Sequence, residues 1–377
     1  MTPSLLHGRR RIAALAAALV AGTLATVVAT SSIDAPKAVA DTSPAPDTGM
    51  PATFGAKPLP TVQVNGIVWA QVTVGNVVYA TGAFTQSRPA GAAPNTQLSP
   101  AGNILAFDIT TGERIMSFNH SMNGTGRSLA VSPDGQRVYV GGDFTAIDGV
   151  ARRHVAAFRT SDGALDPTFD GKVGATVMSI VPTATTVYVG GSFVSAGSGA
   201  GPDVPRTNLA AFNTAGALLP WAPTATGGIV TSMVMAPAAT KLVVAGQFTT
   251  LNGSTQLGMG ALDPTTGAAT TWLANRTIRN SGENSIGGLT TDGTPIYGAG
   301  QAWWGTANFE GRFALDPADG PIVYNDCHGD TYATLPVNGV LYSTGYNHDC
   351  SAVNGFPDFP TGRVVAPPWP RPRSPPA

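Results

Sequence analysis

A glycine-centred segment that recurs along the chain constrains the fold more than any other feature of the sequence. Its most regular copy is V-Y-V-G-G-D-F at 138–144. Related segments occupy 78–84, 187–193, 242–248, 296–303 and 341–347. The glycine that they share is Gly82, Gly142, Gly191, Gly246, Gly300 and Gly345. Consecutive copies are therefore 45 to 60 residues apart, which indicates an internal repeat.

Two further segments keep step with the glycine segment. One contains an A-A-F or A-L pattern that ends in a turn glycine, at 105–112, 156–163, 210–216, 260–267 and 313–320. An aromatic residue follows each turn: Phe118, Phe169, Trp221, Trp272 and Tyr324. The other precedes each glycine segment, as in S-L-A-V-S-P-D-G at 128–135. Each unit of about fifty residues thus predicts about four short antiparallel strands.

Such a unit cannot bury both faces of its sheet alone, and radial stacking of these sheets is the β-propeller solution. Charged residues make up 11% of the chain, against 46 glycines and 31 prolines, which leaves little to cover exposed helices. We therefore expect an all-β fold, a β-propeller of about six blades with four strands each. A β-helix, the alternative, uses much shorter rungs.

The glycines themselves allow two interpretations. A phosphate-binding loop would need a helix after it, and no helical pattern follows. In a strand, Val138, Val140, Gly142 and Phe144 share one face. We therefore expect Gly142 to leave room for a side chain of the neighbouring blade.

The N-terminus has the pattern of an export signal. Arg9, Arg10 and Arg11 precede an apolar stretch at 12–29, and Ala38-Val39-Ala40 supplies small residues at a cleavage site. We predict cleavage between Ala40 and Asp41 and a secreted product. A retained membrane anchor is the alternative, for which the stretch is short.

The expected organisation is a signal peptide at 1–40, a disordered linker at 41–60, the propeller at 61–360 and a disordered proline-rich tail at 361–377. Removing residues 1–40, with four basic side chains and one acidic, changes the formal charge from −1 to −4. The mature chain has no basic patch, so nucleic acid and anionic membranes are poor partners. We expect a monomer without a membrane span.

The repeat resembles the delta-60 class of propeller repeats, with its best copies at 138–163, 187–216 and 242–267. It resembles more closely a group of exported actinobacterial propeller proteins, through V-W-A-Q at 68–71, S-R-P-A-G-A-A at 87–93 and N-D-C-H-G-D at 325–330. The resemblance covers residues 66 to about 356 and implies the fold, but this group has no established activity. Its members continue beyond the sixth unit, whereas the pattern here stops after 355–360. The last blade is thus expected to be incomplete, through a natural disordered end or a frameshift, and the ring to be open.

Among the acidic residues, seven aspartates occupy Asp-Gly turns or one repeated position and are explained structurally, whereas eight, Asp143 among them, have no such explanation. Asp143 instead lies in a slot that varies between repeats while its neighbours are kept. The residues in this slot are Ala83, Asp143, Ser192, Gln247, Gln301 and Tyr346. A varying slot is where a propeller could differentiate its blades, which makes Asp143 a candidate ligand-binding residue.

Both cysteines lie in the sixth unit, Cys327 in N-D-C-H-G-D and Cys350 in N-H-D-C. In an exported chain with two cysteines in adjacent strand-like segments, a disulfide is the simplest interpretation. A metal-thiolate pair is the alternative.

The same region contains Asp326, His328 and Asp330, which would project to one face of a strand, with His348 nearby through the disulfide. These four residues could hold a divalent metal. The simpler interpretation, and our expectation, is a polar loop around the disulfide without metal.

The paired aromatics Trp303 and Trp304 replace the repeat phenylalanine in the fifth unit. They could stack a sugar ring, or they could fill the interface between blades. His120 and His154 are isolated in the sequence and are interpreted as surface or loop residues.

The function that we expect is an exported, non-catalytic propeller that binds a ligand or partner through loops on one face, with a carbohydrate or cell-envelope polymer as the target class. No cofactor is expected, because no Walker, G-x-S-x-G or H-E-x-x-H motif occurs. The alternative is a propeller hydrolase, lyase or quinoprotein-like dehydrogenase. That alternative requires Asp143, His328, Asp330 and His348 to converge at a central channel. A truncated chain without a working function is a third possibility.

Overall fold

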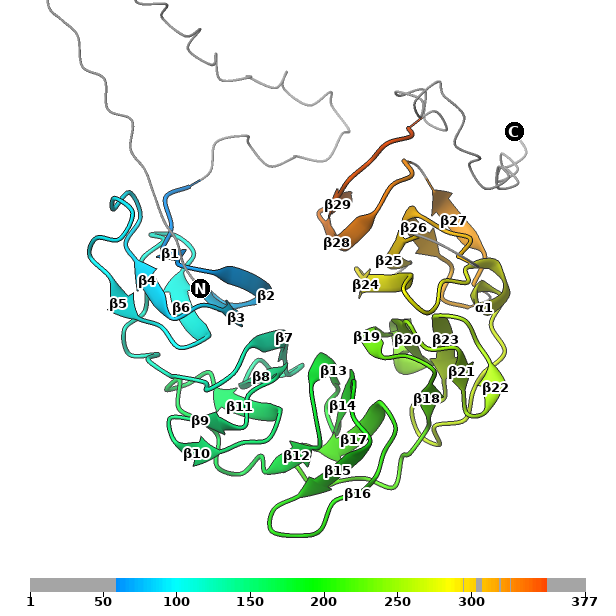
Figure 1. Ribbon diagram of the computed structural model, residues 1–377, viewed down its shortest axis with the longest axis horizontal. Helices are drawn as coiled ribbons and strands as arrows, with labels where there is room; N and C mark the ends of the chain where they lie inside the picture. Colours follow the sequence, from blue (N-terminus) through cyan, green and yellow to red (C-terminus); the bar gives the residue numbers. More distant parts are fainter. Residues whose placement is uncertain (1–58, 294, 303–306, 319, 326, 351–377) are drawn as a thin grey trace, which may run out of the picture. The chain divides into compact units, whose positions relative to one another are not determined.

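The computed structural model describes residues 59–293, 295–302, 307–318, 320–325 and 327–350 (Figure 1). Within these ranges the only helical elements are one α-helical turn, α1 (Ala274–Thr277), and one 3-10 turn, η1 (Pro237–Ala239). No helix in this part has the length and apolar character needed to span a membrane. The predicted export signal, its predicted cleavage site between Ala40 and Asp41, and the proline-rich segment at 361–377 lie outside the described residues. The prediction of an all-β chain is confirmed.

Six main sheets follow one another along the chain, and in each the glycine strand pairs antiparallel with the strand before it. The first two sheets are β2 (Ile67–Val74), β3 (Val77–Ala83) and β6 (Ile104–Asp108), then β7 (Gly126–Val131), β8 (Arg137–Gly142) and β11 (Val155–Arg159). The next two are β13 (Val177–Pro182), β14 (Thr186–Gly191) and β17 (Leu209–Asn213), then β19 (Val230–Met235), β20 (Leu242–Gly246) and β23 (Met259–Leu262). The fifth is β24 (Ser285–Thr291), β25 (Ile296–Gln301), β26 (Gly311–Leu315) and β27 (Ile322–Asn325), and the sixth is β28 (Thr331–Val337) and β29 (Val340–Gly345).

The predicted fourth strand is shorter than expected in the first four sheets. There the chain returns after the A-A-F strand to form one isolated bridge: Phe107 with Arg114, Phe158 with Leu165, Phe212 with Leu218, and Leu262 with Ala269. In the second and third sheets, Pro167 and Pro220 follow two residues after the bridge. Because proline has no N–H to donate, the ladder cannot continue through it. The fifth sheet does form a fourth strand, β27.

Small additional sheets accompany the first four main sheets. Each takes strands from the loop between the glycine strand and the A-A-F strand, and three of them add a short strand from the segment before the first strand. These are formed by β1 (Gln63–Val64), β4 (Gln86–Arg88) and β5 (Ser99–Pro100); by β9 (Ala146–Ile147) and β10 (Val150–Ala151); by β12 (Gly171–Val173), β15 (Ser195–Ser198) and β16 (Val204–Pro205); and by β18 (Ala225–Thr226), β21 (Thr250–Leu251) and β22 (Ser254–Thr255). The repeat unit is therefore larger than four strands, because what the sequence presents as a long loop is a paired hairpin.

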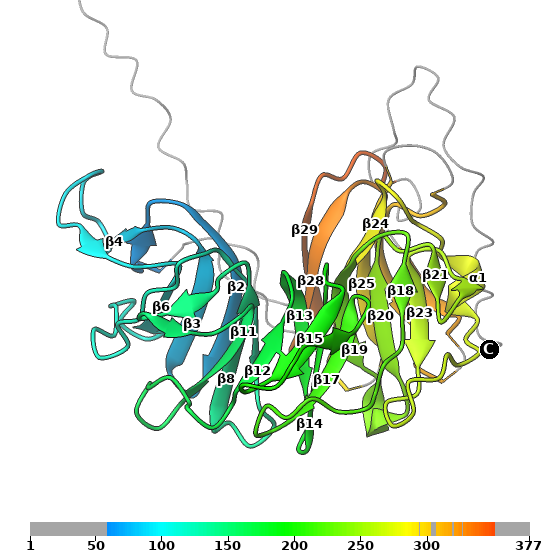
Figure 2. The ribbon, with the colours of Figure 1, turned by 60° about the horizontal axis from the view of Figure 1, so that its bottom comes forward.

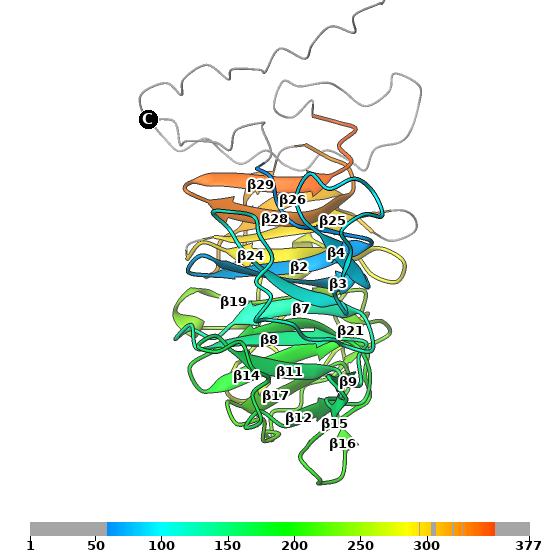
Figure 3. The ribbon, with the colours of Figure 1, turned by 90° about the vertical axis from the view of Figure 1, so that its left-hand side faces the viewer.

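Consecutive main sheets pack against each other through their first strands. Strand β2 contacts β7, β7 contacts β13, β13 contacts β19, β19 contacts β24 and β24 contacts β28 (Figures 1 and 2). Strand β28 also contacts β25, which seats the last two strands beside the fifth sheet (Figure 3). Buried side chains fill the space between sheets: Tyr139 and Ala157 of the second sheet belong to one cluster with Val187 and Phe212 of the third. This arrangement explains why the strands lack a polar face.

The aromatic residues predicted after each turn are part of this core. Phe118, Phe169, Trp221 and Trp272 are all buried. The first three pack edge-to-face on the tyrosine of their own glycine strand, with ring centroids 5.1–5.2 Å apart. Such pairs stabilise a core beyond the area that they bury. The side chain of Tyr324 lies outside the described part of the chain.

The role of Gly142 differs from the prediction. A Cβ at Gly142 would overlap the carbonyl oxygen of Thr125, which precedes the first strand of the same sheet. The glycine that faces a neighbouring sheet is Gly141, where a Cβ would lie 2.6 Å from Cγ1 of Val177. Backbone approach within one sheet, rather than room for a neighbour's side chain, therefore requires glycine at this position in five of the six repeats; at Gly300 the nearest atom belongs to the side chain of Phe309.

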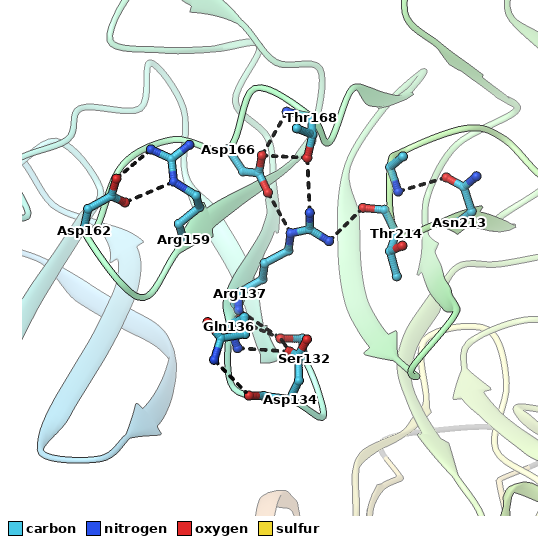
Figure 4. A network of polar contacts seen from close by, with 11 residues as sticks. Ser132, Asp134, Gln136, Arg137, Arg159, Asp162, Asp166, Thr168, Asn213 and Thr214 are labelled. Atoms are coloured by element: carbon cyan, nitrogen blue, oxygen red, sulfur yellow. Dashed lines mark hydrogen bonds and ion pairs between the residues drawn. The ribbon is translucent and has the colours of Figure 1, made fainter.

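Side chains also cross from one sheet to the turn of the next. Arg137, at the start of β8, donates from Nη1 to the carbonyl of Thr214 at 3.0 Å and from Nε to Asp166 at 2.7 Å (Figure 4). Asp166 is buried, and its other oxygen accepts from Thr168. Burial alone would raise the pKa of the Asp166 carboxyl, but hydrogen bonds from Thr168 and Arg137 outweigh it and lower the pKa below 3.8. This network is structural, because its charges are paired and its donors satisfied.

Candidate ligand-binding site

The first strands carry a repeated irregularity opposite the shared glycine. In five of the six main sheets, one residue of the first strand is skipped in the pairing register at this point. The skipped residues are Trp69, Arg127, Met178, Thr231 and Tyr332. A β-bulge of this kind re-aims one side chain and increases the local twist. Each of these strands therefore presents one redirected side chain at an equivalent place, and its residue type changes from sheet to sheet.

Two of these side chains meet on adjacent strands. Arg127 of β7 lies over the indole of Trp69 of β2, with its guanidinium carbon 5.4 Å from the ring centroid. Trp69 is 51% exposed, so the guanidinium leaves about half of the residue open to solvent. The planar cation fixes the orientation of an aromatic ring that would otherwise be held by its own strand alone.

Asp143 completes this arrangement. Its Oδ2 accepts from Nε and Nη2 of Arg127 at 3.0 and 2.9 Å, and its Oδ1 accepts from the Thr176 hydroxyl at 2.6 Å. Trp69, Arg127, Asp143 and Thr176, here called the Trp69 cluster, thus connect the first three main sheets. The side chains of Arg127 and Asp143 are each about one-third exposed.

The Trp69 cluster is suited to binding rather than to acid–base chemistry. Asp143 is engaged by a guanidinium and a hydroxyl, and the ion pair cancels its charge. What remains accessible is a broad apolar ring bordered by hydrogen-bonding groups without net charge. Sites of this composition orient a ligand through a few polar contacts while burial on the aromatic surface supplies affinity.

The backbone explains why the slot of Asp143 can vary. The N–H of Asp143 donates to the carbonyl of Thr125 at 2.7 Å, and the N–H of Ser192 donates to Thr176 in the same way at 3.0 Å. Gln247 repeats this bond with Ile229. The main chain is therefore held identically in these sheets, so the side chain in the slot is free to change.

The structure joins Cys327 and Cys350 in the predicted disulfide, with Cα atoms 4.2 Å apart. Next to it, His328 and Asp349 form an isolated antiparallel bridge. The two cysteines thus tie together the segments on either side of the last two strands.

His328 and Asp330 lie between two strands rather than within one. Strand β27 ends at Asn325 and β28 begins at Thr331, and Gly329 between them has φ of +131°. The segment therefore bends where the prediction required a continuous strand. Asp326 lies outside the described residues.

Both histidines of this region contact Glu310, His328 at its main chain and His348 at its carboxylate. His328 Nδ1 lies 3.0 Å from the carbonyl oxygen of Glu310, and His348 Nε2 lies 3.0 Å from its Oε1. Asp330, the residue that precedes β28, is buried. Across residues 59–350 as described, no group of three or more histidine, cysteine, aspartate or glutamate side chains is arranged to hold a metal ion.

The convergence that an enzyme would require is not seen in the described residues. The hydrogen bonds of the Asp143 side chain go to Arg127 and Thr176, and none of them reaches His328, Asp330 or His348. Trp303 and Trp304, the other aromatic candidates, lie outside the described part of the chain.

His120 and His154 are more integrated than the sequence suggested. His120 lies between the rings of Phe118 and Phe158 and contacts Asp148, with Nδ1 2.5 Å from Oδ2. His154 has φ of +65° at the position where other repeats place Asn103 or Asn208, and burial lowers its pKa. Both are structural residues. The signal for His154 was its place in the repeat, where asparagine tolerates positive φ.

Trp69, Arg127 and Thr176 were not identified as site residues from the sequence. Trp69 belongs to the V-W-A-Q segment, and nothing in that segment marks a bulge. The available signal was a position whose residue type changes from repeat to repeat. It follows the first-strand residue that pairs with the shared glycine, and it is occupied by Trp69, Arg127 and their counterparts.

Comparison with known proteins supports a propeller repeat. The family model described as "Domain of unknown function (DUF5122) beta-propeller" matches residues 133–169. This match supports a propeller-repeat family. No curated protein matches the chain. Among solved structures, the computationally designed Ika8 protein (crystal packing No.1 in P63) is similar at 12% identity and a TM-score of 0.43, over 74% of this chain and 80% of that one.

Proposed function

We propose that the chain is an exported, non-catalytic β-propeller that binds a carbohydrate or cell-envelope polymer through the Trp69 cluster. The observation that carries this proposal is the half-exposed Trp69 ring under a guanidinium whose charge Asp143 cancels. A neutral sugar ring has one apolar face and a rim of hydroxyls. It therefore matches an open aromatic surface that is bordered by hydrogen-bonding groups without net charge.

The ligand class follows from the balance of charge in the cluster. A strongly anionic ligand would have to compete with Asp143 for Arg127, and a cationic ligand would compete with Arg127 for the Trp69 face. Both would leave one member of a hydrogen-bonded ion pair without its partner, which costs more than the pair gains. An uncharged polysaccharide does not require this exchange.

The finer fold assignment belongs to the same proposal. Six glycine strands, each paired with a first strand, support about six blades, the last represented by β28 and β29. The resemblance to delta-60 repeats and to exported actinobacterial propellers is consistent with the short family match at 133–169. The export signal is supported by its sequence pattern and is compatible with the Cys327–Cys350 disulfide. Mass spectrometry of the protein from the culture medium should find an N-terminus at Asp41, whereas an intact residue 1 would contradict it.

The binding proposal is tested with a panel of neutral and acidic polysaccharides on an array, followed by calorimetry with the best ligand. Trp69→Ala should weaken binding at least about tenfold, because aromatic anchors dominate such contacts. Trp69→Phe should retain part of the affinity. Ile67→Ala, also exposed on β2 but outside the Trp69 cluster, is the matched control and should bind like the parent. Unchanged binding by Trp69→Ala would refute the assigned site, and a preference for charged polymers would refute the ligand class.

A further inference from the structure

A pocket of about 690 Å³ lies between the third and fourth main sheets, away from the Trp69 cluster. Its lining includes Thr186 and Tyr188 of β14, Trp221, Met235 and Pro264. None of the twelve residues that line it is charged, and four of them are threonines. By contrast, the pocket of about 250 Å³ at the second sheet is lined by paired aspartates and arginines. The larger pocket is therefore the one suited to an uncharged molecule.

The repeat explains why this groove is open. The residue just before each V-Y-V or L-V-V pattern is Arg137, Thr186 or Lys241 in three consecutive sheets. Arg137 crosses to the carbonyl of Thr214 in the next turn, and Lys241 crosses to the carbonyls of Pro317 and Ala318 at 2.8 Å. Thr186 is too short to cross. Arg137 spans the gap between the second and third sheets, and Lys241 spans the gap between the fourth and fifth. The corresponding gap between the third and fourth sheets is left unfilled.

Two aromatic rings at the pocket, Tyr188 and Trp221, have their polar atoms hydrogen-bonded to the backbone. The Tyr188 hydroxyl donates to the carbonyl of Pro264 at 2.7 Å, the position equivalent to Thr214 and Pro317 in the other turns. Trp221 donates from Nε1 to the carbonyl of Asp263 at 3.2 Å and packs edge-to-face on Tyr188. Both rings are buried, so a ligand would meet preformed apolar walls with threonine hydroxyls around them.

We propose that this pocket, here called the Thr186 pocket, binds an uncharged small molecule with an apolar face and a hydrogen-bonding edge. Its volume lies within the range of small-molecule sites, about 300–1,000 Å³. A charged ligand would lose its hydration without finding an opposite charge in the lining, which is strongly unfavourable. The site is independent of the function proposed for the Trp69 cluster.

The test uses three probes with one ring system: 2-naphthylmethanol, 2-naphthoate and 2-naphthylmethylammonium. Ligand-observed NMR should detect binding of the neutral alcohol, with the two ions at least about tenfold weaker. Thr186→Lys places in the pocket the side chain that Lys241 uses in the next sheet, and it should abolish binding. Val194→Lys, at a residue 77% exposed, adds the same charge without filling the pocket and should bind like the parent.

A second measurement does not depend on the variant's folding. In protein labelled at the methionine methyl groups, the alcohol should shift the Met235 resonance, which Met235→Leu identifies. Equal binding of the alcohol and the ions would refute the ligand class. Binding that survives in Thr186→Lys, or an unshifted Met235 methyl, would refute the pocket. Loss of binding in Trp69→Ala would place the probe at the other site and would refute this assignment as well.

Discussion

The guanidinium of Arg127 lies over the ring of Trp69, although the two residues belong to different repeat units. Both side chains leave their strands at a β-bulge opposite the shared glycine, and the bulges direct them toward each other. Asp143, one residue beyond the shared glycine, then holds Arg127 in place from the second side. A site is thus assembled from a bulge position that recurs in five of the six main sheets and that holds Trp69 and Arg127 on neighbouring strands.

The first prediction concerns the ion pair of this site. Arg127→Met and Asp143→Asn should each destabilise slightly, and a double-mutant cycle should give a coupling of about 0.5–1 kcal/mol, because both side chains are about one-third exposed. The measurement is the free energy of unfolding in urea. A coupling near zero would mean that the pair does not orient Arg127. Glycan affinity should fall in both single variants, since either change leaves Trp69 less well positioned.

The second prediction concerns Asp166, whose side chain is 3% exposed and paired with Arg137. Asp166→Asn should destabilise by roughly 1–3 kcal/mol at pH 7, because it leaves a partly buried guanidinium without its carboxylate. The parallel change Asp162→Asn is the control. Asp162 is half exposed and pairs with Arg159 in the same turn, so its loss should matter much less.

The same pair predicts a pH dependence. The folded-state pKa of Asp166 is lower than its ordinary value of 3.8, so as pH falls the unfolded chain takes up the proton first. The stabilisation is therefore complete above about pH 4 and is lost as pH falls through the folded-state pKa. The free energy of unfolding of Asp166→Asn should accordingly approach that of the parent in strong acid. A difference that stays constant from pH 7 to pH 2 would contradict this origin.

The third prediction separates two kinds of glycine. Gly142→Ala should destabilise by at least about 1–3 kcal/mol, because its Cβ would overlap the Thr125 carbonyl and that backbone cannot move without breaking the bulge. Gly287→Ala is the matched control on β24, since its Cβ would find only the Thr231 hydroxyl at 3.9 Å. Alanine there should be neutral or slightly stabilising. Thermal unfolding of the two variants distinguishes them, and equal losses would refute the steric account.

The fourth prediction concerns the disulfide. Cys327 and Cys350 are separated by 23 residues, and closing such a loop stabilises by about 3 kcal/mol in the chain-entropy model. The double variant Cys327→Ser with Cys350→Ser should lose about that amount, first in β28 and β29, which the bond encloses. Hydrogen exchange localises the loss, and thiol titration of the unreduced parent should find no free thiol. Two titratable thiols would contradict the bond.

The sequence determined the all-β class, the repeat and the pairing of Cys327 with Cys350, because these depend on local pattern and composition. A strand that runs from Val138 to Gly142 is apolar on both faces whether or not its neighbours are known, and this predicts burial between sheets. The aromatic residues after each turn were likewise recognised from their spacing, and the structure shows that four of them, Phe118, Phe169, Trp221 and Trp272, are buried.

Only the tertiary structure decided which side chains meet. A β-bulge adds one residue to one strand and leaves no mark in the sequence, so the contact of Trp69 with Arg127 was not predictable. The importance of Thr186 was not predictable either. It depends on the hydrogen bonds that Arg137 and Lys241 make, across the gap to the next sheet, with carbonyls 77 and 76 residues further along the chain. Local pattern specifies how each sheet folds, whereas the site and the pocket depend on contacts between sheets that distant segments make.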